Sequence, residues 1–346
     1  MKLRLIPMIL AVQAAAFAAD PSLLRMVMPD AKVIAGIQVA QTKNSLFGQF
    51  VLSHMQVDDA GFQKFAAQTG FDPLRDVSEI LIASNWQSSS PESKWLVMAR
   101  GTFNLTKIGH AAEAHGAQPS NFQGVDLYSY SAPVKSTAAK PDAANPDAPN
   151  PDATKPTVEN GIAFLDASTA LLGDLSSVKA AIGRWKGNVP ANDALIAKVR
   201  DVSAKNDFWF VTLVPVSEFA GAMPDANLGG AMKGNLLAGI SQASGGVRFG
   251  DTVSISAEAI ARSDKDAQAL VDVVKFVAGM VQLNRDNNPT AGQVATLLDT
   301  LDCKAAGNVT TISLAIPETQ LEQMLANMRP QSRQTRKRPP APAPVN

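Results

Sequence analysis

A hairpin followed by a helix, in residues 161–186 (GIAFLDASTALLGDLSSVKAAIGRWK), limits most strongly what this chain can fold into. Two short apolar runs, 162–166 and 170–173, flank a tight turn, and this pattern predicts a pair of strands. Strands joined by so short a turn must run antiparallel. Asp174 and Ser176 then open a run in which apolar residues recur at helical spacing. The stretch therefore predicts an α+β protein built on antiparallel strands.

The same order of elements occurs twice along the chain: strand, helix, two strands, helix, two strands, helix. The matched segments are 31–41 with 208–216, 79–101 with 241–261, the helix after Gly101 with the helix after Arg262, and 168–182 with 309–325. Consecutive strands with short connections and interspersed helices favour antiparallel sheets that helices cover. We therefore predict two related halves, each a mostly antiparallel sheet with helices packed on one face.

The longest predicted helix, 264–283, is opened by the capping pair Ser263 and Asp266. Its broad apolar stripe is interrupted mainly by Asp272 and Lys275. The polar face lacks the lysines and arginines typical of a helix that lies on a membrane, so we expect a central core helix. In an alternative interpretation, the same stripe lines a cavity for an apolar ligand beneath this helix.

Residues 1–18 (MKLRLIPMILAVQAAAFA) have the order of charges, apolar run and small residues that is typical of a secretory signal peptide. The apolar run is too short to remain in a bilayer, and Ala16-Phe17-Ala18 forms a small-x-small cleavage site before Ala19. No cysteine follows this site to carry a lipid anchor. We therefore predict export through a cleavable signal peptide, to the periplasm or the medium, and no transmembrane segment in the mature protein.

A Pro-, Asp- and Ala-rich segment interrupts the first half, with Pro-Asp-Ala recurring at Pro141, Pro146 and Pro151. It lacks the apolar residues that packing requires, so we expect 133–157 to be a disordered loop inserted in a hairpin. The predicted organisation is a signal peptide at 1–18, a first half at 19–190, a second half at 191–328 and a tail at 329–346.

The net charge of zero conceals an uneven distribution, because residues 19–328 carry a net charge of −7. The Pro-rich tail holds five basic residues and no acidic one: Arg329, Arg333, Arg336, Lys337 and Arg338. An acidic body repels phosphate, so a nucleic-acid-binding fold is not expected. We expect the tail to be disordered, and either solvated or in contact with an anionic surface of the cell envelope.

Cys303 is the only cysteine, so no intrachain disulfide is possible and the thiol is expected to be buried as a small apolar group. His110 and His115 are five residues apart, which places them about 140° apart on a helix, whereas metal-binding helices use a spacing of four. We therefore expect neither a metal nor a cofactor.

A start like MPDAKVIAGIQV, followed later by a hairpin and helix like STALLGDLSSVKAAI, resembles uncharacterised exported bacterial families with a duplicated α+β unit. The resemblance covers most of residues 28–328 and implies an exported location. It implies no chemistry, because the function of these families is unknown.

Ser176 and Lys179 are the candidate catalytic residues, since they form a Ser-x-x-Lys at a helix start. Serine acyl-transferring enzymes use this spacing to place a lysine against the nucleophile. A position near the helix cap explains Ser176 equally well. We therefore expect a non-enzymatic binding or envelope-associated scaffold protein. The alternatives are a serine acyl hydrolase that uses these two residues, and a carrier of an apolar ligand.

Overall fold

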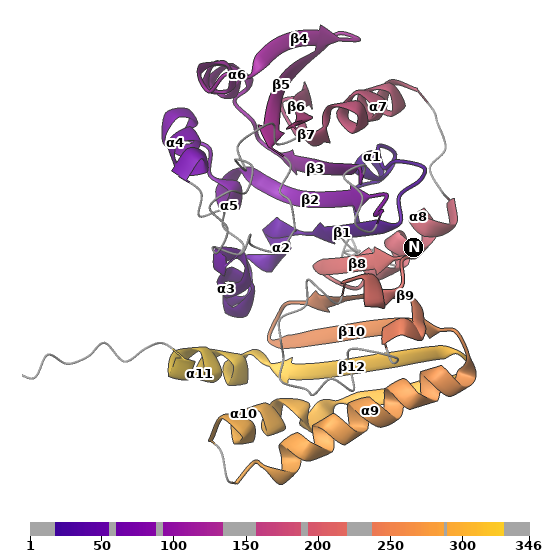
Figure 1. Cartoon of the computed structure of the whole chain (residues 1–346). Coiled ribbons are helices and arrows are strands. Elements are labelled where there is room, and N and C mark those ends of the chain that lie inside the picture. Colours follow the sequence, from indigo (N-terminus) through magenta and orange to yellow (C-terminus); the bar gives the residue numbers. More distant parts are fainter. Residues whose placement is uncertain are drawn as a thin grey trace, which may run out of the picture.

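The structure is a computed structural model, and it describes residues 18–54, 60–87, 93–133, 157–187, 193–219, 237–286 and 289–328. Within these residues, one sheet of 12 strands runs through both halves of the chain, and every neighbouring pair is antiparallel (Figure 1). The strand order is β11-β12-β10-β9-β8-β1-β2-β3-β7-β6-β5-β4. The strands are β1 (Val33–Ile37), β2 (Val77–Ser84), β3 (Trp95–Gly101), β4 (Gln118–Phe122), β5 (Val125–Pro133), β6 (Thr157–Asp166), β7 (Thr169–Asp174), β8 (Phe208–Thr212), β9 (Ile240–Arg248), β10 (Thr252–Ala261), β11 (Asp302–Ala306) and β12 (Val309–Pro317). A mixed helix and strand fold on an antiparallel sheet is therefore as predicted.

Most helices lie in connections between these strands, while α1 precedes β1 and α11 follows β12. They are α1 (Pro21–Leu24), α2 (Val39–Thr42), α3 (Leu46–His54), α4 (Ala60–Thr69), α5 (Pro73–Asp76), α6 (Leu105–Ala114), α7 (Leu175–Lys186), α8 (Asp193–Ser203), α9 (Asp264–Leu283), α10 (Pro289–Leu297) and α11 (Glu318–Met328), with short 3-10 helices at η1 (Val216–Phe219) and η3 (Leu298–Thr300). The predicted caps are confirmed at α7 and α9, where the side chains of Asp174 and Ser263 accept hydrogen bonds from backbone N–H groups.

Strands β1 and β8 lie side by side near the centre of the sheet. Gly36 lies opposite Trp209 in this pair. The Trp209 side chain is 0% exposed, and a Cβ added to Gly36 would lie 2.6 Å from its Cε2 atom. Only a glycine at position 36 of β1 therefore leaves room for the indole ring of Trp209 on the neighbouring strand β8.

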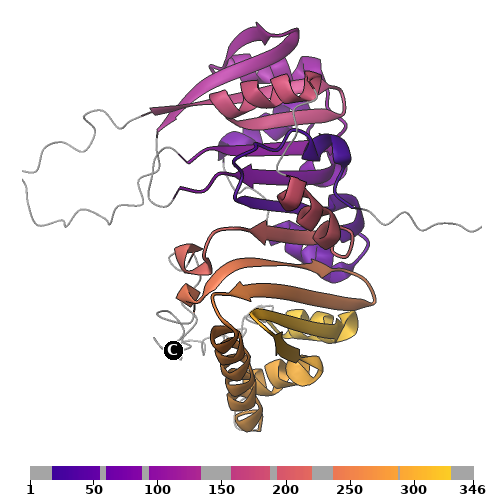
Figure 2. The same ribbon diagram turned by 90° about the vertical axis from the view of Figure 1, so that its right-hand side faces the viewer.

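Helices cover both faces of the sheet, so the prediction of helices on one face is wrong. On one face, here called the α7 face, α1, α7 and α8 pack against Leu81, Met98 and Leu171. On the opposite face, the α6 face, α3 to α6 pack with Ile80 and Ala99. Figure 2 shows α7 and α8 in front of the sheet. The physical reason is that the central strands are apolar on both sides, and a sheet of this kind requires cover on both.

The prediction that 264–283 is a central core helix is also wrong. Of the residues in α9, only Ala267, Leu270 and Val271 are buried, while Phe276 is 65% and Leu283 is 81% exposed. The helix packs mainly against β11, beside the outer edge of the sheet (Figure 1). A helix of this length spans about 30 Å, whereas a five-residue strand spans about 17 Å. The second part of α9 therefore extends beyond the sheet.

The remaining predictions concern Cys303, the interrupted hairpin and the two ends of the chain. Cys303 is buried as predicted, and burial raises the pKa of its thiol. β5 and β6 pair directly, with Pro133 opposite Thr157, as expected of a hairpin with a long connection. The connection itself (134–156), residues 1–17 of the predicted signal peptide and the basic tail lie outside the described residues.

Candidate functional site

A cavity of about 1050 Å³ lies between the α6 face of the sheet and the helices that cover it. The sheet side is formed by β2, β3, β5, β6 and β7, and the helix side by α4, α5 and α6. Its apolar lining includes Ile80, Val97, Ala99, Ile162, Phe164, Ala170 and Leu172 from the strands, and Phe62, Phe65, Pro73, Ile108 and Ala112 from the helices. Ligand pockets in proteins are roughly 300–1,000 Å³ and mostly apolar, so this cavity has the size and lining of a binding site.

A chain of phenylalanine rings crosses the cavity wall from helix to sheet. Ring centroids are 6.2 Å apart between Phe65 and Phe71, 6.2 Å between Phe71 and Phe103, and 5.6 Å between Phe103 and Phe164. These separations are within the range of favourable aromatic pairs. The rings therefore fix α4 and the following turn against β6.

The local sequence explains how Phe71 reaches this position. Helix α4 ends at Thr69, and Gly70 adopts a left-handed backbone conformation with φ of 71°. Asp72 then caps the short helix α5 by accepting a hydrogen bond from the N–H of Leu74. Glycine allows the reversal between the two helices, and Phe71 lies in the reversal, next to the cavity.

Polar residues lie where the cavity opens to solvent. The lining side chains of His115, Gln118 and Glu159 belong to exposed residues, and Tyr130 is half-buried. Nε2 of His115 is 3.2 Å from Oε1 of Gln68. Burial raises the pKa of Tyr130, so its hydroxyl stays protonated at neutral pH. The arrangement combines an apolar interior with polar residues at the exposed side, which suits an apolar molecule with a polar end.

For helix 264–283, a ligand cavity beneath it was only one alternative. The cavity of about 1050 Å³ lies instead beneath α4 to α6. The recurring phenylalanines of GFQKFAAQTGF at 61–71 were the available signal. Their role could not be predicted, because it depends on which face of the sheet α4 covers.

The structure places the two candidate catalytic residues on separate partners. The Ser176 hydroxyl donates to Oδ1 of Asp174 at 2.7 Å. Nζ of Lys179 lies 5.7 Å from the ring centroid of Phe122, as in a cation–π contact. Asp174 also accepts hydrogen bonds from the N–H groups of Ser177 and Trp95. Ser176 thus supports a cap that joins α7 to β3.

We expect Asp174→Ala to lower the free energy of unfolding by about 2 kcal/mol, because it removes a helix cap and leaves the Trp95 N–H without its acceptor. Ser176→Ala, the matched control, should cost about 0.5 kcal/mol. Urea unfolding measures both. An equal cost for the two variants would contradict the role given to Asp174.

The difference in the free energy of unfolding between wild type and Asp174→Ala should also depend on pH. Burial by itself would raise the pKa of Asp174, but hydrogen bonds from Ser176, Ser177 and Trp95 outweigh burial and lower it. A lowered carboxyl pKa contributes stability above the unfolded value of about 3.9 and loses it as pH falls through the folded value. The gap between wild type and Asp174→Ala should therefore narrow below about pH 4.

The remaining candidate residues can be placed only in part. The five basic residues of the tail, Arg329 to Arg338, lie outside the described residues. Within the described ranges, no group of three or more His, Cys, Asp or Glu side chains is placed to hold a metal ion. In the same ranges, no helix is both long and apolar enough to span a membrane.

No protein-family model and no curated protein matches this chain. One similar solved structure is described as "Structure of crystal form I of TP0453". The similarity covers 90% of this chain and 98% of that chain, with a TM-score of 0.44 and 9% sequence identity. At this level of similarity we infer nothing about function from that protein.

Proposed function

We propose that this protein is an exported, non-enzymatic binding protein of the cell envelope, and that its phenylalanine-lined cavity holds an apolar ligand. The observation that carries the proposal is the cavity of about 1050 Å³ between the α6 face and helices α4 to α6. Export is supported by the order of charges, apolar run and small residues in 1–18.

The composition of the lining supports binding over catalysis. Buried carbon side chains such as Ile108 and Phe103 bind a ligand by removing its apolar surface from water, at about 25 cal/mol for each Å². They supply neither a nucleophile nor a proton-transfer group. The polar groups at the mouth can orient the polar end of a ligand, which provides specificity.

Filling the cavity tests the proposal. Ala112 on α6 lines the cavity and is buried, so Ala112→Trp should place an indole ring in the ligand's space. We expect wild type to bind the neutral apolar dye N-phenyl-1-naphthylamine with increased fluorescence, and Ala112→Trp to bind it at least about tenfold more weakly, a loss of about 1.4 kcal/mol.

Ala114→Trp is the matched control, because Ala114 is exposed on the same helix and does not line the cavity. Its dye affinity should equal that of wild type. Equal binding by all three proteins would show that the dye does not occupy this cavity, and no binding by wild type would remove the support for an apolar ligand.

We also propose that the basic tail helps to hold the protein at the envelope. Five cations without an acidic neighbour attract an anionic surface weakly, and salt screens the attraction. Co-sedimentation of the full chain, and of a chain that ends at Met328, with anionic vesicles at low and high salt tests this.

We further propose that the two halves derive from one duplicated unit. Strand orders of β1-β2-β3-β7-β6 and β8-β9-β10-β12-β11 support it, since they correspond one to one from the central pair outwards. The halves differ in their last helices: α7 packs on the α7 face, whereas Leu321 of α11 packs with Val253 and Ile316, which lie on the α6 face. Related chains that contain a single half would test the duplication.

A further inference from the structure

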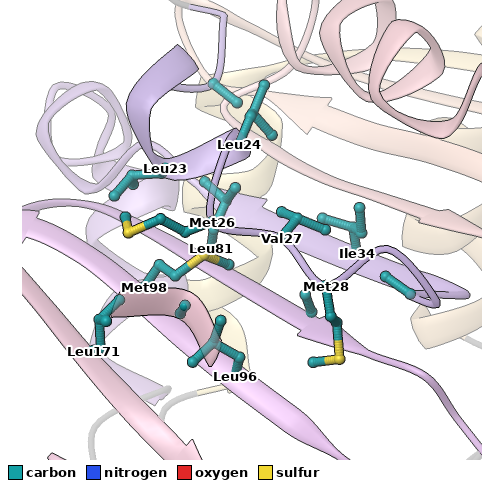
Figure 3. Packing of buried hydrophobic residues seen from close by; sticks show 14 of the residues in the cluster. Leu23, Leu24, Met26, Val27, Met28, Ile34, Leu81, Leu96, Met98 and Leu171 are labelled. Carbon is teal, nitrogen blue, oxygen red and sulfur yellow. The ribbon is translucent and has the colours of Figure 1, made fainter. Parts of the chain in front are cut away.

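Ala19 is the first buried residue of the part of the chain that the structure describes, and it is 1% exposed. The segment that follows, from Leu23 to Met28, packs beside Ile34, Leu81 and Met98 of the sheet (Figure 3). This is the largest buried cluster of the α7 face, and it includes the first residues after the predicted cleavage site. The position of the chain at Ala19 is therefore fixed by the core.

The backbone nitrogen of Ala19 contacts a polar side chain within this core. It donates a hydrogen bond to Oγ of Ser203, at the end of α8, over 3.0 Å. The next nitrogen, that of Asp20, donates to Oε1 of Glu79 over 3.1 Å. Adjacent backbone nitrogens are separated by no more than about 3.7 Å, so the Glu79 carboxylate lies within about 7 Å of the Ala19 nitrogen.

Glu79 is a buried carboxyl group on β2, 6% exposed, that faces one acidic and one basic side chain. These are Asp20, the cap of α1, and Arg100 on β3. The Arg100 guanidinium is engaged by Asp20, with Nε 2.6 Å from Oδ2, and by the Ser22 hydroxyl. Buried carboxylates are normally paired with a cation. Within the described residues, the nearby cation Arg100 is therefore shared with Asp20 and does not serve Glu79 alone.

Burial is the main cause that raises the pKa of Glu79 to about 7, against hydrogen bonds from Asp20 and Gln38 that lower it. Because the pKa of Glu79 is raised in the folded protein, the free energy of unfolding falls as the pH rises. The fall extends from about 4.5, the ordinary pKa of a glutamate, to about 7. A cation close to Glu79 would lower the pKa of Glu79, and the loss of stability at neutral pH would then disappear.

We infer that a signal peptidase cuts the bond between Ala18 and Ala19, and that the new α-ammonium group of Ala19 is held in the folded protein by Ser203 and Glu79. Water adds across the peptide bond, so that Ala18 gains a carboxylate and Ala19 the ammonium group. The small-x-small motif Ala16-Phe17-Ala18 places the cut at this bond. The inference rests on the proposed export.

Cleavage must then come before folding. The bond is accessible in the extended chain, before Ala19 enters the core. Folding afterwards buries the new terminus next to Glu79, where the opposite charges attract each other strongly. Removal of the signal peptide therefore supplies a cation beside Glu79.

The test uses the full chain, expressed in a bacterium and purified after export. N-terminal sequencing and intact mass should show that the protein begins at Ala19. The pKa of the terminal amine, measured by competitive labelling across pH, should fall by about one unit or more in Glu79→Gln, because an opposite charge within reach raises it by that amount. If that variant does not fold, Ser203→Ala should give a fall of the same sign.

A second measurement does not depend on a core variant. A chain with two extra residues, Gly-Ser, before Ala19 should melt at a lower temperature than the chain that begins at Ala19. The inference is overturned by a cut at another bond, by an unchanged amine pKa in the variants, or by equal melting temperatures. A cut at another bond leaves the proposal of export standing, whereas an uncut chain that stays inside the cell overturns both.

Discussion

Replacement of Gly36 by alanine is expected to lower the free energy of unfolding by about 3 kcal/mol, a large cost for the addition of one methyl group. The new Cβ would lie 2.6 Å from Cε2 of Trp209, whose side chain is 0% exposed and cannot move into solvent. The indole Nε1 of Trp209 is also buried, without a hydrogen-bond partner among the described residues. The ring is therefore held by packing alone.

The cost should vanish when the indole is removed. In a Trp209→Leu background, Gly36→Ala should be neutral or stabilising, because it fills space and restricts the unfolded chain. Gly183→Ala is the matched control: nothing lies within 4 Å of its new Cβ, and it should stabilise α7 by about 0.5–1 kcal/mol. Urea unfolding of the four variants measures this. Additive effects of Gly36→Ala and Trp209→Leu would contradict the packing described at the β1–β8 pair.

The second large effect is expected at the cavity wall. Phe103 is buried between the rings of Phe71 and Phe164, so Phe103→Ala should lower the free energy of unfolding by about 3–4 kcal/mol. Part of this loss should return when an apolar dye is added, because a ligand that binds only the folded state stabilises it by about 2.7 kcal/mol at a hundred times its Kd.

Phe276→Ala serves as the control, since Phe276 is exposed on α9. It should change stability by less than about 0.5 kcal/mol. Thermal unfolding with and without the dye measures all three proteins. The cavity assignment would be wrong if the dye stabilised neither wild type nor Phe103→Ala.

The sequence was most informative where a local pattern determines the structure. Ser263 caps α9 as predicted, through its own hydroxyl. Strand β4 escaped prediction because its polar sequence, QPSNF, contains Pro119. Proline is tolerated there because β4 is an edge strand. The pairing of β1 with β8 also could not be predicted from local patterns, because the two strands are about 170 residues apart in sequence.

The positions of α9 and of the cavity were not predicted for a related reason. The broad stripe of α9 is real, but its exposure depends on the short strand β11 against which it packs. The cavity needs α4, α5 and α6 on one face of one sheet, and the position of that face follows from strand order. Residues such as Ala112 and Phe103 show ordinary core spacing in the sequence and acquire a role only through that arrangement.

The most direct test of a ligand-binding role is native mass spectrometry of the protein purified from the envelope of an expressing bacterium. Wild type is expected to carry an apolar molecule that organic extraction removes, and Ala114→Trp is expected to carry it as well. Ala112→Trp should appear at the mass of the chain alone, because its indole fills the cavity. A ligand-free wild-type protein, or the same ligand bound equally in Ala112→Trp, would contradict the proposed function.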